Sequence, residues 1–83
     1  MSDATEPQFS AEDTAEHLRG LQDSADLIDA LIAADDRSDE QRDTMDRNVR
    51  HIGIMCAMQH VRESGADLKP FTDAQHRGAA WLA

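Results

Sequence analysis

The sequence predicts an all-α protein, an antiparallel hairpin of two long helices followed by a short C-terminal third helix. Apolar residues recur at steps of three and four along two long stretches of the chain, which is the spacing of amphipathic helices. Each stretch follows a serine that can open a capping box. The connection between them, residues 35–38, is short and polar. A connection that short forces two long helices to lie antiparallel.

The first helix is expected over about residues 11–34, after a polar tail at residues 1–9. Ser10 begins its capping box, with Asp13 in the reciprocal position. The apolar stripe comprises Ala11, Ala15, Leu18, Leu21, Ala25, Ile28 and Ile32. Gly20 and the Asp23-Ser24 pair weaken the middle of this helix, which leaves open a kink or a break into two helices.

The second helix is expected to follow Ser38, with Gln41 completing its capping box, and to run unbroken to about Glu63. Ser64 and Gly65 then end it, because glycine readily adopts the left-handed conformation after a helix. Side chains in the segment I-G-I-M-C-A-M, residues 52–58, point to most sides of this helix. A helix that is apolar all round needs cover beyond what the first helix supplies.

The third helix is expected over about residues 70–82, with Pro70 at a first helical position. A capping box beginning at Thr72 is a second interpretation of its start. One face of this helix carries Phe71, Ala74, Gly78, Trp81 and Leu82. We expect it to fold back over the end of the second helix, with Gly78 at a close helix crossing. Residues 10–83 would then form a single three-helix domain.

The charge of the chain is unevenly divided. The net charge is −9, made up of −10 over residues 1–47 and +1 over residues 48–83. Direct binding to nucleic-acid phosphates or to an anionic membrane is disfavoured, because both need clustered Lys and Arg. The acidic N-terminus is unlike a secretory signal, and no apolar run is long enough to span a membrane. Cys56 has no cysteine to pair with. We expect a cytoplasmic protein, or one in a particle assembled in the cytoplasm.

Candidate metal and catalytic patterns are incomplete in this chain. Cys56 and His60 are four residues apart, with His51 earlier on the same helix, but a closed zinc site needs four ligands. An acidic loop begins at Asp35, but Arg37 stands where a calcium loop needs an oxygen ligand. Carboxylates fall on polar helix faces, and no nucleophile–base spacing is evident. We therefore expect no enzyme activity, no metal and no cofactor.

The apolar excess at residues 52–61, with the aromatic third helix nearby, has two interpretations. It can complete a three-helix core, or it can form a docking surface for a protein partner or a second copy of the chain. In the second interpretation the protein is an oligomer or part of a larger complex. The expected contact residues are Ile54, Met55, Met58, Val61, Phe71 and Trp81.

A row of carboxylates supports an alternative function. It comprises Asp36, Asp39, Asp43 and Asp46. Such a row can imitate a phosphate backbone, so the protein could be an acidic anti-defence inhibitor of a nucleic-acid-binding enzyme. Arginines interrupt the row, however, and Asp43–Arg47 and Asp46–Arg50 have the spacing of ordinary helical ion pairs. A solvated helix face explains the same pattern.

Three segments carry a resemblance: D-R-N-V-R-H-I-G-I-M, D-L-K-P-F-T-D-A and the final G-A-A-W-L-A. The region of about residues 43–83 that contains them resembles small uncharacterised proteins encoded in phage and prophage genomes. The resemblance implies a virion-associated or accessory role and assigns no functional residue. We therefore expect a non-enzymatic interaction subunit, a small structural or accessory protein of a phage-like assembly.

Overall fold

The structure, a computed structural model, describes residues 9–83. Within that range the chain forms four helices and no strand. They are α1 (Ala11–Ala34), α2 (Asp39–Ala57), α3 (Gln59–Arg62) and α4 (Lys69–Leu82). The all-α prediction is confirmed. The predicted polar tail lies outside the described residues except for Phe9.

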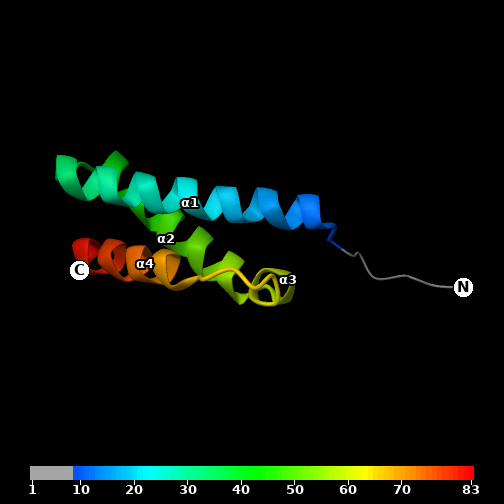
Figure 1. Ribbon diagram of the computed structural model, residues 1–83. Helices are drawn as coiled ribbons and strands as arrows, with labels where there is room; N and C mark the ends of the chain where they lie inside the picture. Colours follow the sequence, from blue (N-terminus) through cyan, green and yellow to red (C-terminus); the bar gives the residue numbers. More distant parts are fainter. Residues whose placement is uncertain (1–8) are drawn as a thin grey trace, which may run out of the picture.

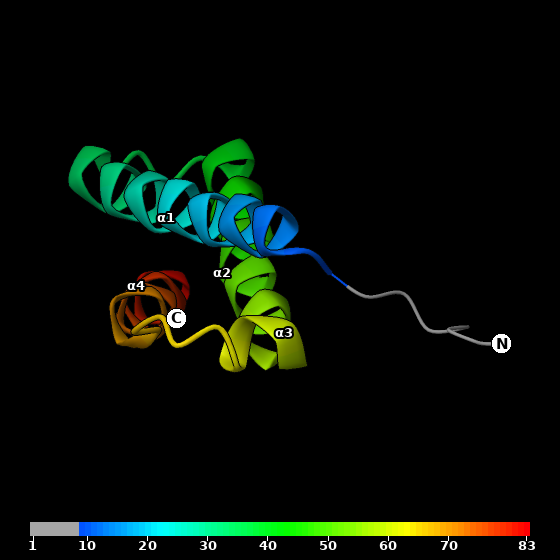
Figure 2. The same cartoon turned by 45° about the vertical axis from the view of Figure 1, so that its right-hand side comes forward.

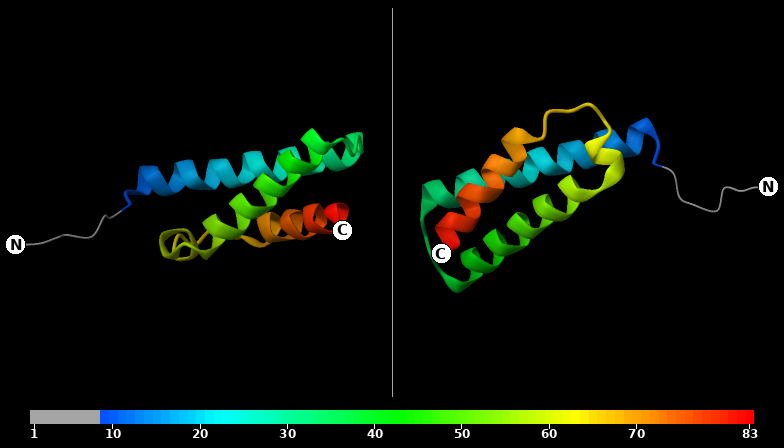
Figure 3. Two further views of the ribbon diagram at one scale, coloured as in Figure 1. Left: turned by 180° about the vertical axis from the view of Figure 1, so that it is seen from behind. Right: turned by 90° about the horizontal axis from the view of Figure 1, so that it is seen from below.

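The three longer helices form one bundle, because α1, α2 and α4 each pack against the other two. Helix α4 lies beside α1 and runs in the same direction, whereas α2 runs obliquely in the opposite direction (Figures 1 and 3). The prediction of a two-helix hairpin with a covering third helix is therefore only partly right. Helix α4 is a full member of the bundle, since its apolar face enters the core through Phe71, Ala74, Gly78 and Trp81.

Helix α1 is continuous through Gly20 and Ser24, which answers the question that the sequence left open. Its capping box is confirmed. The Asp13 N–H donates to Ser10 Oγ at 3.0 Å, and the Ser10 N–H donates to Asp13 Oδ2 at 3.2 Å. The helix ends at Asp35, whose φ of 49° is left-handed and whose N–H donates to the Leu31 carbonyl. A left-handed residue at this place is a common way to end a helix.

The predicted second helix is not continuous, and this is a correction. Met58 has an extended ψ of 136° and separates α2 from α3. A continuous helix would place Val61 seven residues after Ile54 on the same face, where Ile54 keeps 65% of its surface exposed. The break turns Val61 into the core, where it is 0% exposed. Helix α3 then lies near the N-terminal half of α1 (Figure 2), and Gly65 follows with the expected left-handed φ of 84°.

Helix α4 begins at Lys69, one residue earlier than predicted, with Pro70 in its first turn. The second interpretation, a capping box at Thr72, is wrong. The Thr72 hydroxyl instead donates to the Lys69 carbonyl at 3.1 Å, inside the first turn of the helix.

Gly78 stands at the closest approach between α4 and its neighbours, as the sequence predicted. A Cβ at this position would lie 2.7 Å from Val49 Cγ2, 2.9 Å from Met45 Sδ and 3.3 Å from Ile28 Cγ2. The first two distances are too short for a real Cβ contact, and the third is tighter than most such contacts. The glycine therefore sets how closely α4 packs on α1 and α2.

Trp81 joins the end of α4 to the connection between α1 and α2 through hydrogen bonds and a cation–π contact. Its Nε1–H donates to Asp35 Oδ1 at 3.0 Å, and the Arg37 guanidinium lies 4.6 Å from the ring centroid. Arg37 also donates to the Trp81 carbonyl and to Asp35 Oδ1. The hydrogen bonds from Arg37 and then from Trp81 lower the pKa of Asp35. We refer to Asp35, Arg37 and Trp81 as the Trp81 cluster.

Candidate functional site

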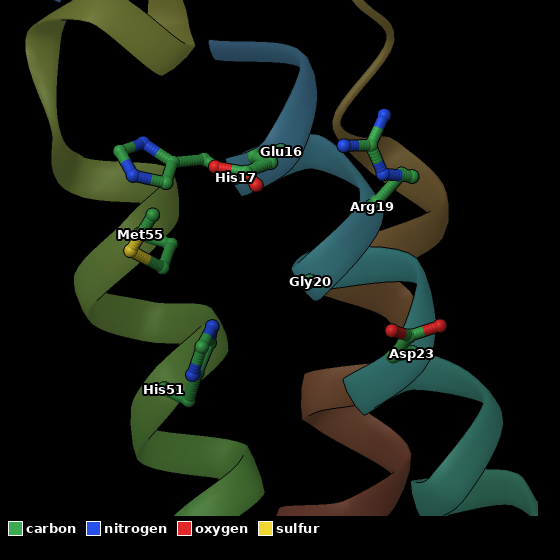
Figure 4. A pocket seen from close by; sticks show the side chains of 7 residues that line it. All are labelled: Glu16, His17, Arg19, Gly20, Asp23, His51 and Met55. Carbon is green, nitrogen blue, oxygen red and sulfur yellow. The ribbon is translucent and has the colours of Figure 1, made fainter. Parts of the chain in front are cut away.

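A groove of about 440 Å³ lies between α1 and α2, near the middle of the N-terminal half of α1 (Figure 4). Residues of both helices line it. The lining residues are Glu16, His17, Arg19, Gly20, Asp23, His51 and Met55. The rim is thus charged, whereas Met55 and the backbone at Gly20 supply apolar surface.

Gly20 lines this groove without a side chain of its own. A Cβ at Gly20 would have His51 Nε2 as its nearest neighbour, at the ordinary contact distance of 3.9 Å. The two helices therefore leave room here for a larger group than hydrogen. Helix α1 tolerates glycine at this position although glycine is about 1 kcal/mol less favourable than alanine in a helix interior.

Large apolar side chains are exposed on both flanks of the groove. On α1, Leu27 follows Asp23 by one turn and is 41% exposed. On α2, Ile54 follows His51 by one turn. Residues three or four apart are neighbours on a helix surface. Each helix therefore carries one exposed apolar side chain a turn away from a residue that lines the groove.

Phe9, His17 and His60 form a cluster in which His17 lines this groove, whereas Phe9 and His60 line a second groove of about 460 Å³. His17 Nδ1 and His60 Nε2 are 2.7 Å apart and share one hydrogen bond between α1 and α3. The Phe9 ring stacks on His60 with centroids 3.9 Å apart and meets the edge of His17 at 5.4 Å. Phe9 is itself 43% exposed. We refer to the groove together with Phe9, Leu27 and Ile54 as the groove face.

The histidine pair constrains the chemistry of this cluster. One imidazole must donate and the other must accept, so at least one of the two is neutral in the observed arrangement.

Within residues 9–83, no three His, Cys, Asp or Glu side chains gather as ligands of a metal ion. Cys56 is half-buried, and burial raises the pKa of its thiol. A raised pKa disfavours the reactive thiolate.

The six predicted contact residues do not share one surface. Ile54 is exposed on the groove face, Met55 lines the groove, and Met58 is half-buried at the helix break. The other three lie in the core: Val61, Phe71 and Trp81. For these three the interpretation as surface residues is corrected. The break at Met58 turns Val61 inward, and the aromatic face of α4 packs into the bundle.

The four carboxylates of the predicted acidic face differ in their partners. Asp43 is paired with Arg47 at 3.2 Å, and Asp46 is paired with Arg50 at 3.1 Å. Asp36 and Asp39 are exposed. Half of the row is therefore locally neutralised, which reduces its similarity to a run of phosphates.

These features define a small α-helical bundle with an open groove between two helices. Comparisons with protein-family models, with curated proteins and with solved structures found no match to the chain. In the described part of the chain, no helix combines the length and apolarity that crossing a membrane requires.

Sequence reasoning missed two parts of the groove face. The sequence indicated Gly20 only as a weak point of α1. Its position between Glu16 and Asp23 on the same side of the helix could have suggested a space next to the missing side chain. The contact between His17 and His60 joins residues 43 positions apart. Nothing local in the sequence indicates that pairing, because it depends on how the break at Met58 directs α3.

Proposed function

We propose that this protein acts by protein–protein contact through the groove face, as a small structural or accessory subunit of a phage-like assembly. One observation carries the proposal. Three large apolar side chains are exposed among residues 9–83, namely Phe9, Leu27 and Ile54. Single exposed apolar residues are ordinary in proteins, but Leu27 and Ile54 each lie one turn from a residue that lines the groove, and the Phe9 ring contacts His17, which also lines it. An apolar surface with a charged rim is typical of contact sites.

The energetics favour a contact of modest strength. Burying a side chain such as isoleucine or leucine from water contributes about 1.5–3 kcal/mol. Three such side chains can offset part of the cost of association, which is of the order of several kcal/mol. A partner therefore needs to fill the groove as well as cover its flanks.

The phage-like setting rests on the resemblance of residues 43–83 to small proteins encoded in phage and prophage genomes. That resemblance supports a virion-associated or accessory role. In this setting the protein works in the cytoplasm or in a particle assembled there.

Site-specific photo-crosslinking in the natural host tests the proposal. A photoreactive amino acid is placed at Ile54 or at Leu27, and in a control at Ala80, which is exposed on α4. We expect the same crosslinked partner from positions 54 and 27 and none from position 80. Mass spectrometry of that product should identify a protein of an assembled particle, or a second copy of the chain.

Two results would contradict this function. One is a strict monomer in light scattering at high concentration together with no crosslink from either groove position. The other is a crosslink from position 80 as strong as that from position 54, which would mean that the groove face has no special role.

Inhibition of a nucleic-acid-binding enzyme by mimicry is the weaker proposal. The exposed Asp36 and Asp39 favour mimicry. The ion pairs of Asp43 and Asp46 oppose it, because they neutralise half of the row of carboxylates. It requires a complex that weakens steeply with salt and that is lost when Asp36 and Asp39 become asparagine. Binding that survives both changes would exclude mimicry.

A further inference from the structure

Helix α1 brings an excess of negative charge to the groove. It contains six acidic residues and one arginine, Arg19. Within the described range, Asp29 is the one acidic residue of α1 held in an ion pair, with Arg77 of α4. The acidic residues in the middle of α2 are neutralised by its own arginines. Of the charged residues of α1, Glu16, Arg19 and Asp23 line the groove, so α1 gives the lining one more negative than positive charge.

Two of these carboxylates stand on either side of the gap at Gly20. Glu16 precedes Gly20 by four residues and Asp23 follows it by three, and both line the groove (Figure 4). In residues 9–83 neither has an ion-pair partner within 4.0 Å. Seven helical residues span about 10 Å. The groove thus presents a seat formed by Gly20 and Met55, with a negative group about one turn away on each side and with Arg19 lining the groove between them in sequence.

A helix with two cations seven residues apart matches this spacing, because it spans the same distance of about 10 Å. An apolar residue midway between the cations would point toward the seat at Gly20 and Met55. Further apolar residues on the same face would meet the flanking Leu27 and Ile54. Helix-in-groove binding of this kind uses anchors at steps of three, four and seven residues.

A second copy of this chain fits the groove less well. Each copy has a net charge of −9 and would bring the same acidic rim to the contact. Like charges placed opposite each other across an interface disfavour association. A positively charged partner is instead attracted, and its encounter with the groove is accelerated.

We infer that the groove binds a basic amphipathic helix of another protein, with an apolar anchor at Gly20 and a lysine or arginine beside Glu16 and beside Asp23. This partner class rests on the proposed contact function. The apolar anchor gives the contact its position, and the two ion pairs set the register of the bound helix.

Binding of a labelled peptide, measured by fluorescence anisotropy, tests the inference. The probe is a short amphipathic helix of leucine and lysine, and its control carries glutamate in place of every lysine. Two changes alter the groove: the single variant Gly20→Leu, which fills the seat, and the double variant Glu16→Gln/Asp23→Asn. The matched control Asp36→Asn/Asp39→Asn removes the same two charges at the far end of α1.

We expect the lysine peptide to bind and the glutamate peptide not to bind. The Glu16→Gln/Asp23→Asn variant should weaken binding roughly fivefold to tenfold, in line with two partly screened ion pairs. The matched control should weaken it less than about twofold. Gly20→Leu should weaken binding by more than about tenfold, while its helical circular dichroism and thermal unfolding show that it is folded.

Equal loss in the two double variants would overturn the inference, because it would indicate general attraction to an acidic protein. Undiminished binding to Gly20→Leu, or no binding of the lysine peptide at all, would overturn it as well. The contact function is judged separately by the crosslinks from positions 27 and 54. If these persist while the peptide tests fail, the basic partner is wrong and the contact function stands.

Discussion

The two halves of α1 meet the rest of the molecule in different ways. Toward Ala34, the Trp81 cluster joins the helix end to α4, and the Gly78 crossing lies in the same bundle core. Toward Ala11, α1 meets α2 across an open groove and is joined to α3 by a single histidine hydrogen bond. The first region is packed, whereas the second leaves apolar surface exposed and holds carboxylates that have no ion-pair partner among residues 9–83.

Two glycines make this difference plain. At Gly78 there is no room for even one methyl group, so the glycine lets helices approach closely. At Gly20 the nearest atom lies at an ordinary contact distance, so the glycine leaves space. The same residue type therefore serves stability in one region and, in our proposal, recognition in the other.

The largest effect is expected from Trp81→Ala, which removes the anchor of the packed region. Truncating a buried aromatic residue costs about 3–5 kcal/mol, and this change also removes the indole that donates to Asp35 and lies under the Arg37 guanidinium. Urea unfolding followed by circular dichroism measures the loss. On the groove face, Ile54→Ala should change the free energy of unfolding by less than about 0.5 kcal/mol. Similar losses for both variants would remove the contrast between the two regions.

Gly78→Ala should have the next largest effect. The added methyl group must displace Val49 and Met45, and overpacking of this kind costs about 1–3 kcal/mol. The gain in helix propensity of up to about 1 kcal/mol offsets only part of that cost. A variant as stable as the parent in urea unfolding would show that α4 can move away from α2 without loss.

Gly20→Ala provides the matched comparison, with a smaller effect of opposite sign. The new methyl group meets only His51 Nε2, at the ordinary contact distance of 3.9 Å, so the change should raise the free energy of unfolding by about 0.5–1 kcal/mol. Thermal unfolding of the two glycine variants side by side checks the signs. Destabilisation by Gly20→Ala would mean that the groove is closed in solution.

Local features of the fold followed from the sequence, because they depend on nearby residues. Ser10 and Asp13 identified the start of α1, and the apolar steps gave its length. Gly78 was placed at a close crossing because it lies on the apolar face of α4. The break at Met58 could not be predicted, because continued helix is locally favourable there. The break depends on the free energy gained when Val61 is buried against helices that are distant in sequence.

The site was harder to predict than the fold. Ile54 and Met55 were expected at a contact surface, which stays a prediction; Met55 lines the groove and Ile54 is exposed one turn beyond His51. Phe71 and Trp81 were expected there too, because aromatic residues serve interfaces and cores equally well and a sequence does not distinguish the two uses. Asp35 was seen only as one acid of a crowded loop, although it ends α1 and accepts from Trp81.

The smallest effect, a dependence on pH, follows from that role of Asp35. The hydrogen bonds from Arg37 and Trp81 hold its pKa in the folded protein below the ordinary value, so folding favours the ionised carboxylate. Its stabilisation is therefore complete above the unfolded pKa of about 4 and is lost as the pH falls through the lower folded pKa.

Asp35→Asn isolates this contribution, because asparagine tolerates the left-handed conformation and still accepts from Trp81. The parent should be more stable than the variant at neutral pH, and the difference should shrink toward about pH 3. Asp73, whose pKa is lowered by Lys69, is present in both proteins and cancels in the comparison. Urea unfolding of both proteins across this range measures the difference. A difference that stays constant with pH would mean that the charge of Asp35 contributes nothing and that the packed region depends on Trp81 burial alone.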